Sequence, residues 1–348
     1  MRAVVFRSEG LVEVVDRPEP ETQEPTDAVL RVRRAAICGS DLHFFHGKAP
    51  MEPGTTMGHE AVGVVEQVGD DVLLISAGDR VVTSFHIACG ACWFCHAGQS
   101  GLCERHRILG GGPFGGDLDG TQAGFVRVPI AGVNLLPVPE RVDDEAALFV
   151  GDVLTTGVYA ASIADPSPDE VIAVIGAGPV GFCVAEAMRA RGADRVFALD
   201  REPSRLDVVV ATGAEPVDLR TANAEMVLAR ETDGRGADVV VDAVGTPDAF
   251  ETSLEVVRRG GRIVVVGMYT SESVELQLGV AWIRGIRLLF AGETPVHRWW
   301  GPTMDDVVTG ALDPRPLVSH RLPIDEARAG YAAFDARTAT KVVLDPWA

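Results

Sequence analysis

The chain has 348 residues, of which 47% are hydrophobic and 23% charged, and this composition is ordinary for a globular protein large enough for two domains. Its formal net charge of −19 argues against binding to nucleic acid or to an anionic membrane surface, because both need clustered lysine and arginine. No stretch has the length and apolar character of a signal peptide or a membrane span, so we expect a cytoplasmic protein.

The first 83 residues predict a domain rich in short β-strands. The candidate strands are apolar or alternating segments, separated by a proline-rich region at 18–25 and by Gly-Asp turns. They cover residues 3–6, 12–15, 28–32, 62–68 and 80–83. Many short strands with glycine-rich turns are typical of a partly closed β-barrel, although this pattern does not fix the strand order.

The segment 38–60 holds residue types that bind metals and carry protons. It begins Cys38-Gly39-Ser40-Asp41-Leu42-His43 and ends Gly58-His59-Glu60. Cysteine and histidine are preferred zinc ligands, and a catalytic zinc keeps three protein ligands and one open position. Taken alone, the segment is better explained by a buried thiol near a surface histidine.

Four of the six cysteines lie in one short loop: Cys89, Cys92, Cys95 and Cys103. Four thiolates at this spacing can enclose a zinc ion with no open position, which predicts a structural zinc. An iron–sulfur cluster also uses four thiolates, but its common spacings differ. Disulfides are not expected in a reducing cytosol, and Cys183 is expected to be a small buried side chain in a helix.

The glycine-rich stretch 109–124 is predicted to be a mobile surface loop, because no strand–turn–helix context suggests a phosphate site. Asp152 follows Gly151 at the start of a predicted helix. On local grounds alone, its role would be to cap that helix.

From about residue 154 the pattern changes to alternating strands and helices. A continuous apolar strand at 171–175 leads into a glycine-rich turn and then a helix to about 191, and a second strand at 195–199 ends at Asp200. The turn reads Gly176-Ala177-Gly178-Pro179-Val180-Gly181. This arrangement predicts a dinucleotide site with the pyrophosphate at the helix N-terminus.

Asp200 favours NAD over NADP, because its carboxylate can bind the ribose hydroxyls and would repel a 2′-phosphate. The neighbouring Arg201 weakens that preference, and with Arg205 it could hold a 2′-phosphate if Asp200 were replaced.

Later segments complete the pattern of a doubly wound α/β sheet. Strands are expected at 238–242, 262–266 and 287–290, and helices near 203–212, 222–231 and 247–258. Val244, Val266 and Met268 fall at carboxyl ends of strands, where a nicotinamide would bind.

These motifs together resemble the zinc-dependent medium-chain alcohol dehydrogenase family. Residues 58–65 resemble its Gly-His-Glu signature, 38–43 its metal and proton-relay segment, and the four-cysteine loop its structural-zinc lobe. Residues 122–139 resemble the formaldehyde-dehydrogenase-like branch. The match continues through 319–323 and 341–344 and so covers essentially the whole chain.

The resemblance implies a GroES-like catalytic domain over 1–153 and 293–348, with a structural-zinc lobe at about 86–106. A Rossmann domain that binds NAD would occupy 154–292, with the active site in the cleft between the domains. Two zinc ions per chain are implied, the catalytic one held by Cys38, His59 and Asp152. Many family members have cysteine in place of Asp152, but the charges of this set still sum to about zero with Zn²⁺.

Further roles follow from the same resemblance. Ser40 and His43 would carry the alcohol proton outward, Asp41 would orient His59, and Glu60 would lie beside the metal. The family also suggests that Phe85 lines the substrate pocket, Thr156 supports the nicotinamide and Lys341 meets the pyrophosphate. Gly39 stands where some members have a basic residue, so one pyrophosphate contact is missing.

The implied reaction is hydride transfer between a small alcohol, or its aldehyde or ketone, and NAD, in a homodimer or homotetramer. One alternative is a polyol or amino-alcohol dehydrogenase, and a second is a thiol-linked formaldehyde dehydrogenase. A third is a nucleotide-binding protein without catalysis, which the complete set of metal and relay residues argues against.

Overall fold

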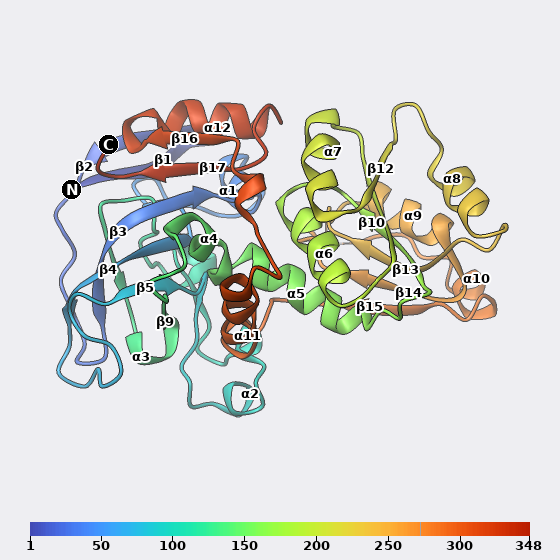
Figure 1. Cartoon of the computed structure of the whole chain (residues 1–348). Helices are drawn as coiled ribbons and strands as arrows, with labels where there is room; N and C mark the ends of the chain where they lie inside the picture. Colours follow the sequence, from blue (N-terminus) through green and yellow to red (C-terminus); the bar gives the residue numbers. More distant parts are fainter. Residues whose placement is uncertain (272) are drawn as a thin grey trace. The chain divides into compact units, whose positions relative to one another are not determined.

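The computed structural model describes residues 1–271 and 273–348 (Figure 1). The chain forms two compact units, one of Met1–Thr155 with Pro295–Ala348 and the other of Thr156–Thr294. The domain boundaries expected from the sequence, at 153/154 and 292/293, each lie two residues before the boundaries of these units. The expected fold class, a GroES-like β-rich domain with a Rossmann domain, is confirmed.

The first unit is built on a seven-stranded sheet around β3 (Ala28–Ile37). This strand pairs antiparallel with β4 (Glu60–Val68), β8 (Phe125–Val128) and β17 (Val342–Asp345), so the end of the chain returns to the middle of the sheet. The other members are β5 (Arg80–Thr83), β9 (Leu135–Pro137) and β16 (His320–Pro323). The predicted strand at 28–32 is longer than expected, because Ala35, Ala36 and Ile37 are buried between its neighbours.

Two small sheets and several short helices complete this unit. The sheets are β1 (Arg2–Ser8) with β2 (Leu11–Asp16), and β6 (His86–Ile87) with β7 (Arg107–Ile108). The helices are α1 (Asp41–Phe45), α2 (Trp93–His96), α3 (Ala131–Asn134), α4 (Asp144–Leu148), α11 (Val296–Thr309) and α12 (Ala327–Asp335), with α5 (Val153–Ala164) starting at the unit boundary. Figure 1 shows α12 beside β16 and β17, near both chain ends.

Among the described residues, no single helix is long and apolar enough to cross a membrane. The segments Asp144–Gly151 and Val153–Ala164 reach the necessary length and composition only as a pair, and that pair is bent by 54°.

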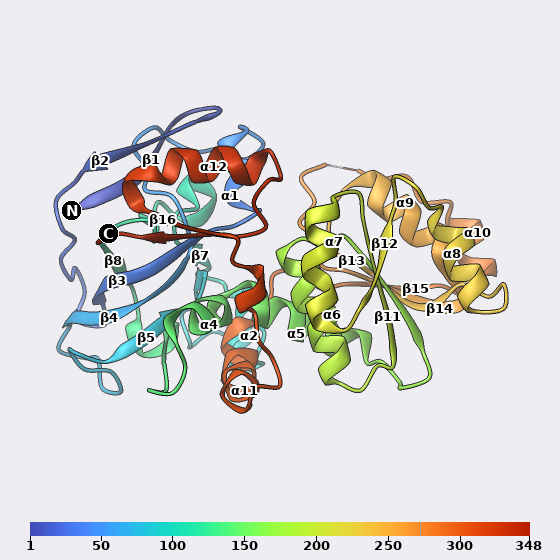
Figure 2. The same cartoon turned by 45° about the horizontal axis from the view of Figure 1, so that its top comes forward.

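The second unit is a six-stranded parallel sheet in the order β12-β11-β10-β13-β14-β15. Its strands are β10 (Val171–Ile175), β11 (Arg195–Asp200), β12 (Glu215–Asp218), β13 (Ala237–Asp242), β14 (Val257–Val265) and β15 (Arg287–Phe290). Its helices are α6 (Pro179–Ala190), α7 (Pro203–Val209), α8 (Ala224–Glu231), α9 (Pro247–Val256) and α10 (Leu278–Ile283). Helices α6 and α7 lie on one face of the sheet and α8 and α9 on the other (Figure 2).

Most of these elements match the sequence expectation, and β12 is the strand that it missed. Val217 is the one fully buried residue of β12, so this edge strand lacks the apolar run that marks β10 and β13.

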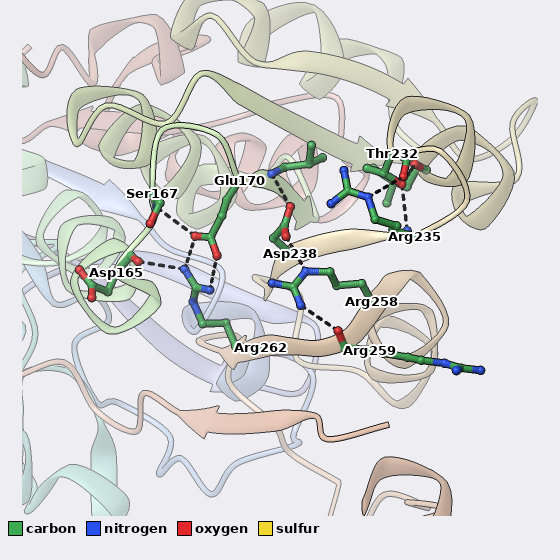
Figure 3. Close-up of polar contacts among 12 residues, drawn as sticks. Asp165, Ser167, Glu170, Thr232, Arg235, Asp238, Arg258, Arg259 and Arg262 are labelled. Carbon is green, nitrogen blue, oxygen red and sulfur yellow. Dashed lines mark hydrogen bonds and ion pairs between the residues drawn. The ribbon is translucent and has the colours of Figure 1, made fainter. Parts of the chain in front are cut away.

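A polar network fixes the amino-terminal ends of the central strands (Figure 3). The buried guanidinium of Arg262 on β14 donates to Glu170 Oε1 at 2.7 Å and to the Asp165 carbonyl at 2.9 Å. Asp238 on β13 accepts from Arg258 and from the backbone N–H of Val171, the latter at 2.8 Å. A buried arginine needs this many acceptors, so the network holds the loop after α5 against the sheet.

Candidate metal and nucleotide sites

The three predicted catalytic ligands come together in the first unit. Cys38 directly follows β3 and His59 directly precedes β4, and antiparallel pairing of these strands brings their ends side by side. Asp152 lies between a 3₁₀ turn, Phe149–Gly151, and α5. Asp152 Oδ2 lies 3.6 Å from Cys38 Sγ and 3.3 Å from His59 Nε2, and all three ligand atoms lie within 4.8 Å of one another.

This set fits a zinc ion in spacing and in charge. Zinc–ligand bonds of about 2.0–2.3 Å place neighbouring ligands of a tetrahedron roughly 3.3–3.8 Å apart, which matches the two measured separations. Burial raises the pKa of the Cys38 thiol, and the carboxylate of Asp152 raises it further. A buried thiol facing a carboxylate is the kind of donor pair that a divalent cation stabilises.

His59 is enclosed by residues of the same segment. Its Nδ1 lies 3.2 Å from Asp41 Oδ1, and its Nε2 lies 3.2 Å from the Ser40 hydroxyl. Burial lowers the pKa of His59, but the Asp41 carboxylate raises it and the net shift is upward. The ring therefore presents Nε2 toward the other ligands while Asp41 holds Nδ1.

Lys341 has a partner that the sequence did not predict. Its ammonium group is fully buried in the first unit, 2.6 Å from Glu60 Oε2, and both side chains are 0% exposed. Burial lowers the pKa of Lys341, but the attraction of Glu60 outweighs this effect and the pKa lies above its ordinary value. The structure thus pairs Lys341 with the acid next to His59, and the contact with the cofactor pyrophosphate that the resemblance implies stays a prediction.

The four cysteines of the lobe form the second candidate zinc site. Cys95 Sγ lies 3.5 Å from Cys92 Sγ and 3.9 Å from Cys89 Sγ, and Cys92 Sγ lies 3.9 Å from Cys103 Sγ. Zinc–thiolate bonds of about 2.3 Å predict separations near 3.8 Å. Backbone N–H groups of Glu104 and Cys95 lower the pKa of Cys92 to about 6, which favours the thiolate that zinc needs.

The glycine-rich turn in the second unit has the conformation that a dinucleotide site requires. Gly176 directly follows β10 and has φ +93°, and a Cβ on Gly181 would lie 1.8 Å from the Gly176 carbonyl oxygen, so both positions need glycine. Gly178 is the N-cap of α6, and Pro179 and Val180 form its first turn. A Cβ added to Gly178 would lie 3.5 Å from Arg205 Nη1. The free N–H groups of this helix end are suited to bind a phosphate.

Asp200 stands at the end of β11, next to this turn. Its Oδ2 accepts from the Ala177 N–H at 2.7 Å, its Oδ1 accepts from the Arg201 N–H at 2.7 Å, and Arg205 Nη1 lies 3.8 Å away. The acid and the two arginines discussed for NADP are therefore close together in the fold.

The other predicted residues are distributed over both units. Val244 and Met268 are 44% and 42% exposed beyond the carboxyl ends of β13 and β14, and Val266 is half-buried beside them. Thr156 is buried and shares a hydrogen bond of 3.0 Å with Thr294. In the first unit, Phe85 meets the ring of His59 edge-on at 6.3 Å and His43 is half-buried on α1.

The expectation of a surface loop at 109–124 is wrong for much of the stretch, because residues 109–112 and 120–124 are buried. The backbone N–H of Thr121 donates to the Gly58 carbonyl at 2.9 Å, and that of Gln122 donates to the Met57 carbonyl at 2.9 Å. The stretch thus packs against the residues that precede His59. The glycines gave no signal of this contact, but Gln122 and Tyr331, both fully buried, prove to be neighbours of the metal site.

Comparison with known proteins agrees with this architecture. The family described as Alcohol dehydrogenase GroES-like domain matches residues 24–140, and the family described as Zinc-binding dehydrogenase matches residues 179–299. A probable zinc-binding alcohol dehydrogenase of Mycobacterium tuberculosis is 38% identical over 97% of this chain and 86% of its own length.

Two solved structures are similar over almost the full chain. Alcohol dehydrogenase TADH from Thermus sp. ATN1 is 40% identical, with 99% of each chain covered and a TM-score of 0.94. A putative zinc-binding dehydrogenase from Sinorhizobium meliloti 1021, bound to NADP, is 28% identical, with 99% of each chain covered and a TM-score of 0.87.

The chain therefore belongs to the zinc-dependent medium-chain alcohol dehydrogenase family, as the resemblance implied. It is an alcohol dehydrogenase-like oxidoreductase, and its family uses zinc and a nicotinamide cofactor.

Proposed function

We propose that this protein oxidises a small alcohol to its aldehyde or ketone with NAD, and catalyses the reverse reaction. The observation that carries the proposal is the convergence of Cys38, His59 and Asp152 within 4.8 Å, in a buried site beside the Ser40 hydroxyl. Three ligands of this composition leave a fourth position for a substrate oxygen.

The two bound groups would supply the chemistry that side chains lack: zinc is a Lewis acid toward the alcohol oxygen, and the nicotinamide accepts a hydride. The chain's own task is to handle the proton. Ser40 would accept the alcohol proton and His43 would pass it to solvent, while the hydride leaves the same carbon for NAD. The products are a carbonyl compound, reduced NAD and one proton, so atoms and charge balance.

Burial gives His43 a suitable acid–base character. Burial lowers the pKa of His43 from its ordinary value, and the positive charges of Lys48 and His46 lower it further. The imidazole is then neutral and able to accept a proton at pH 7.

NAD is the proposed cofactor because Asp200 places a carboxylate where the ribose hydroxyls of a bound dinucleotide would lie. The S. meliloti neighbour was solved with NADP, so the choice needs a direct test. Asp200→Ser should move the ratio of kcat/KM values toward NADP, since Arg201 and Arg205 could then hold a 2′-phosphate. Equal use of the two cofactors by the wild type would refute the NAD assignment.

A panel of alcohols, polyols, amino alcohols and aldehydes, with metal content measured in parallel, tests the function itself. Simple alcohols should give the highest kcat/KM. A rate that appears only with added glutathione or mycothiol would instead indicate a thiol-linked formaldehyde dehydrogenase and support the formaldehyde-dehydrogenase-like branch. Full zinc content without turnover of any substrate would indicate a nucleotide-binding protein without catalysis.

For quaternary structure, we propose that a second copy of the chain covers the outer edge of the six-stranded sheet. β15 is the last strand of that sheet, and Phe290 on it, with Trp282 and Ile283 on α10, is 70–80% exposed. Pairing two identical edges would satisfy open backbone groups and bury these apolar side chains. Phe290→Glu should lower the molar mass measured by light scattering, whereas Met226→Glu, at an exposed position on α8, should not.

A further inference from the structure

The orienting acid of the metal site is itself held by two buried residues. Gln122 Nε2 donates to Asp41 Oδ2 at 3.1 Å and to the Ala36 carbonyl at 3.1 Å. The Tyr331 hydroxyl donates to Gln122 Oε1 at 3.0 Å. Gln122, Tyr331 and Asp41 are each 0% exposed, so water does not compete for these hydrogen bonds.

These contacts leave the Gln122 amide one orientation. Its two N–H donors face a carbonyl and a carboxylate, and its oxygen faces a hydroxyl donor. A flipped amide would place its oxygen against two acceptors in the protein interior, at a cost of about 1–3 kcal/mol for each unsatisfied group. The Ala36 carbonyl and the Asp41 carboxylate therefore decide that Gln122 donates to Asp41, and the Tyr331 hydroxyl satisfies the remaining amide oxygen.

The two carboxylate oxygens of Asp41 contact different ligand residues, Cys38 and His59. Its Oδ2 accepts from Gln122 and from the backbone N–H of Cys38, the latter at 2.9 Å. Its Oδ1 remains for His59 Nδ1 at 3.2 Å. With Oδ2 fixed, the carboxylate cannot rotate freely, and the direction of the His59 ring is fixed with it.

The glycine before His59 makes room for this arrangement. Gly58 has φ +90°, and a Cβ there would lie 2.4 Å from Gln122 Cγ. Any larger residue at position 58 would displace the glutamine. Gly58, the first residue of the Gly-His-Glu motif, therefore leaves the space that the Gln122 side chain occupies.

We propose that Gln122 and Tyr331 are positioning residues for the catalytic metal, acting through Asp41 and His59 and not by contact with the ion. This inference rests on the proposed zinc site at Cys38, His59 and Asp152. Tyr331 belongs to α12, so the returning C-terminal segment completes the support of a ligand set whose first member is Cys38.

The test uses the zinc-loaded full-length enzyme and two conservative variants. Gln122→Met keeps the side-chain length and removes all three hydrogen bonds, and Tyr331→Phe removes only the hydroxyl. Tyr269→Phe is the matched control, because Tyr269 donates to Asp242 at 2.6 Å in the other unit. The rate at which a chelator removes the catalytic zinc is measured, along with the absorption spectrum after cobalt replaces that zinc.

We expect Gln122→Met to weaken retention of this zinc by about 10- to 100-fold, the usual effect of losing a group that orients a ligand. The Tyr331 hydroxyl is one hydrogen bond further from the metal site than Gln122, so Tyr331→Phe should weaken zinc retention less, roughly threefold to tenfold. The cobalt absorption bands should shift in both variants. Zinc in the four-cysteine site should leave at the wild-type rate throughout, and the Tyr269 control should match the wild type.

Unchanged zinc release and unchanged cobalt bands in both variants would overturn the proposal. A lower melting temperature with both signals unchanged would assign the two residues to folding alone and would overturn it equally. Neither readout depends on turnover, so a wild type that binds zinc but oxidises no alcohol would refute the proposed function without deciding this point.

Discussion

The two candidate zinc sites of this protein are built in opposite ways. The four-cysteine site takes every ligand from residues 89–103, and three of its cysteines are only half-buried. The Cys38–His59–Asp152 site joins ligands up to 114 residues apart and is supported by buried side chains from the end of the chain. A short loop depends on its ion for shape, whereas a site built by the fold keeps its ligands together through packing and hydrogen bonds.

The difference predicts that losing a ligand lowers thermal stability at the four-cysteine site and catalytic activity at the Cys38–His59–Asp152 site. Cys103→Ser should remove one zinc equivalent and lower the melting temperature by about 10 °C or more, because a closed zinc site contributes directly to folding. Cys38→Ser should also remove one equivalent, but should keep the melting temperature close to wild type and lower alcohol oxidation by roughly a thousandfold or more. Metal analysis and calorimetry test both, and a Cys103 variant of full stability would show that the lobe needs no ion.

The stability of the protein should also depend on the buried ion pair beside the Cys38–His59–Asp152 site. Lys341→Met would leave the Glu60 carboxylate buried without a cation, and should lower the free energy of unfolding by about 3–5 kcal/mol. Adding Glu60→Gln should recover most of this loss. Arg321→Ala is the control, since Arg321 pairs with Glu145 at 2.6 Å on the surface and its loss should cost less than about 1 kcal/mol. Chemical denaturation measures all three, and equal effects of Lys341→Met and Arg321→Ala would contradict this account of the site.

Replacing His43 should lower the rate of proton transfer without affecting zinc binding, unlike replacement of the residues that hold the metal. His43→Gln should lower alcohol oxidation at pH 7 by roughly 10- to 100-fold without loss of zinc, because the terminal proton acceptor is gone. Higher pH or added imidazole should restore part of the rate. In the wild type, the lowered pKa of His43 implies that the rate declines only below about pH 6.5, where the ring begins to hold its proton. A His43 variant with the wild-type rate and pH profile, under conditions where hydride transfer limits turnover, would remove His43 from the relay.

A smaller effect, on the pH dependence of stability, is expected at the contact between the four-cysteine lobe and the rest of its unit. Asn134 hydrogen-bonds to the backbone of Ala88, the residue before Cys89, and its Oδ1 lies 2.8 Å from His297 Nε2. Burial lowers the pKa of His297 to about 4. In the unfolded chain this group has an ordinary pKa near 6.5, so the unfolded state binds more protons and stability falls as pH decreases from 6.5 to 4.

His297→Gln keeps a hydrogen-bond donor for Asn134 and removes this titration. The slope of unfolding free energy against pH between 6.5 and 4 should become shallower by up to about 1.4 kcal/mol per pH unit. Identical slopes for the His297 variant and the wild type would show that the imidazole takes up its proton in the folded protein.

The sequence by itself determined what depends on local pattern. The apolar run at 171–175 marked β10 with the bounds found in the structure, because a parallel strand buried on both faces needs such a run. The strand expected at 287–290 also has the bounds of β15, although this edge strand is more exposed. The glycine-rich sequence identified the nucleotide-binding turn, and the cysteine spacing identified the zinc lobe, because all residues of each motif lie within fewer than twenty positions. Family resemblance added the distant set Cys38, His59 and Asp152, which spacing alone left undecided.

Tertiary structure decided which partner each buried polar group has. The sequence predicted that 109–124 lies on the surface, but the fold places most of that stretch in the interior, and it pairs Lys341 with Glu60, a contact that the sequence did not predict. Nothing in the local pattern distinguishes a lysine that meets solvent from one that meets a buried acid. A buried polar group must find its partner among whatever residues the fold brings near, and for Gln122 that partner is Tyr331, 209 residues away.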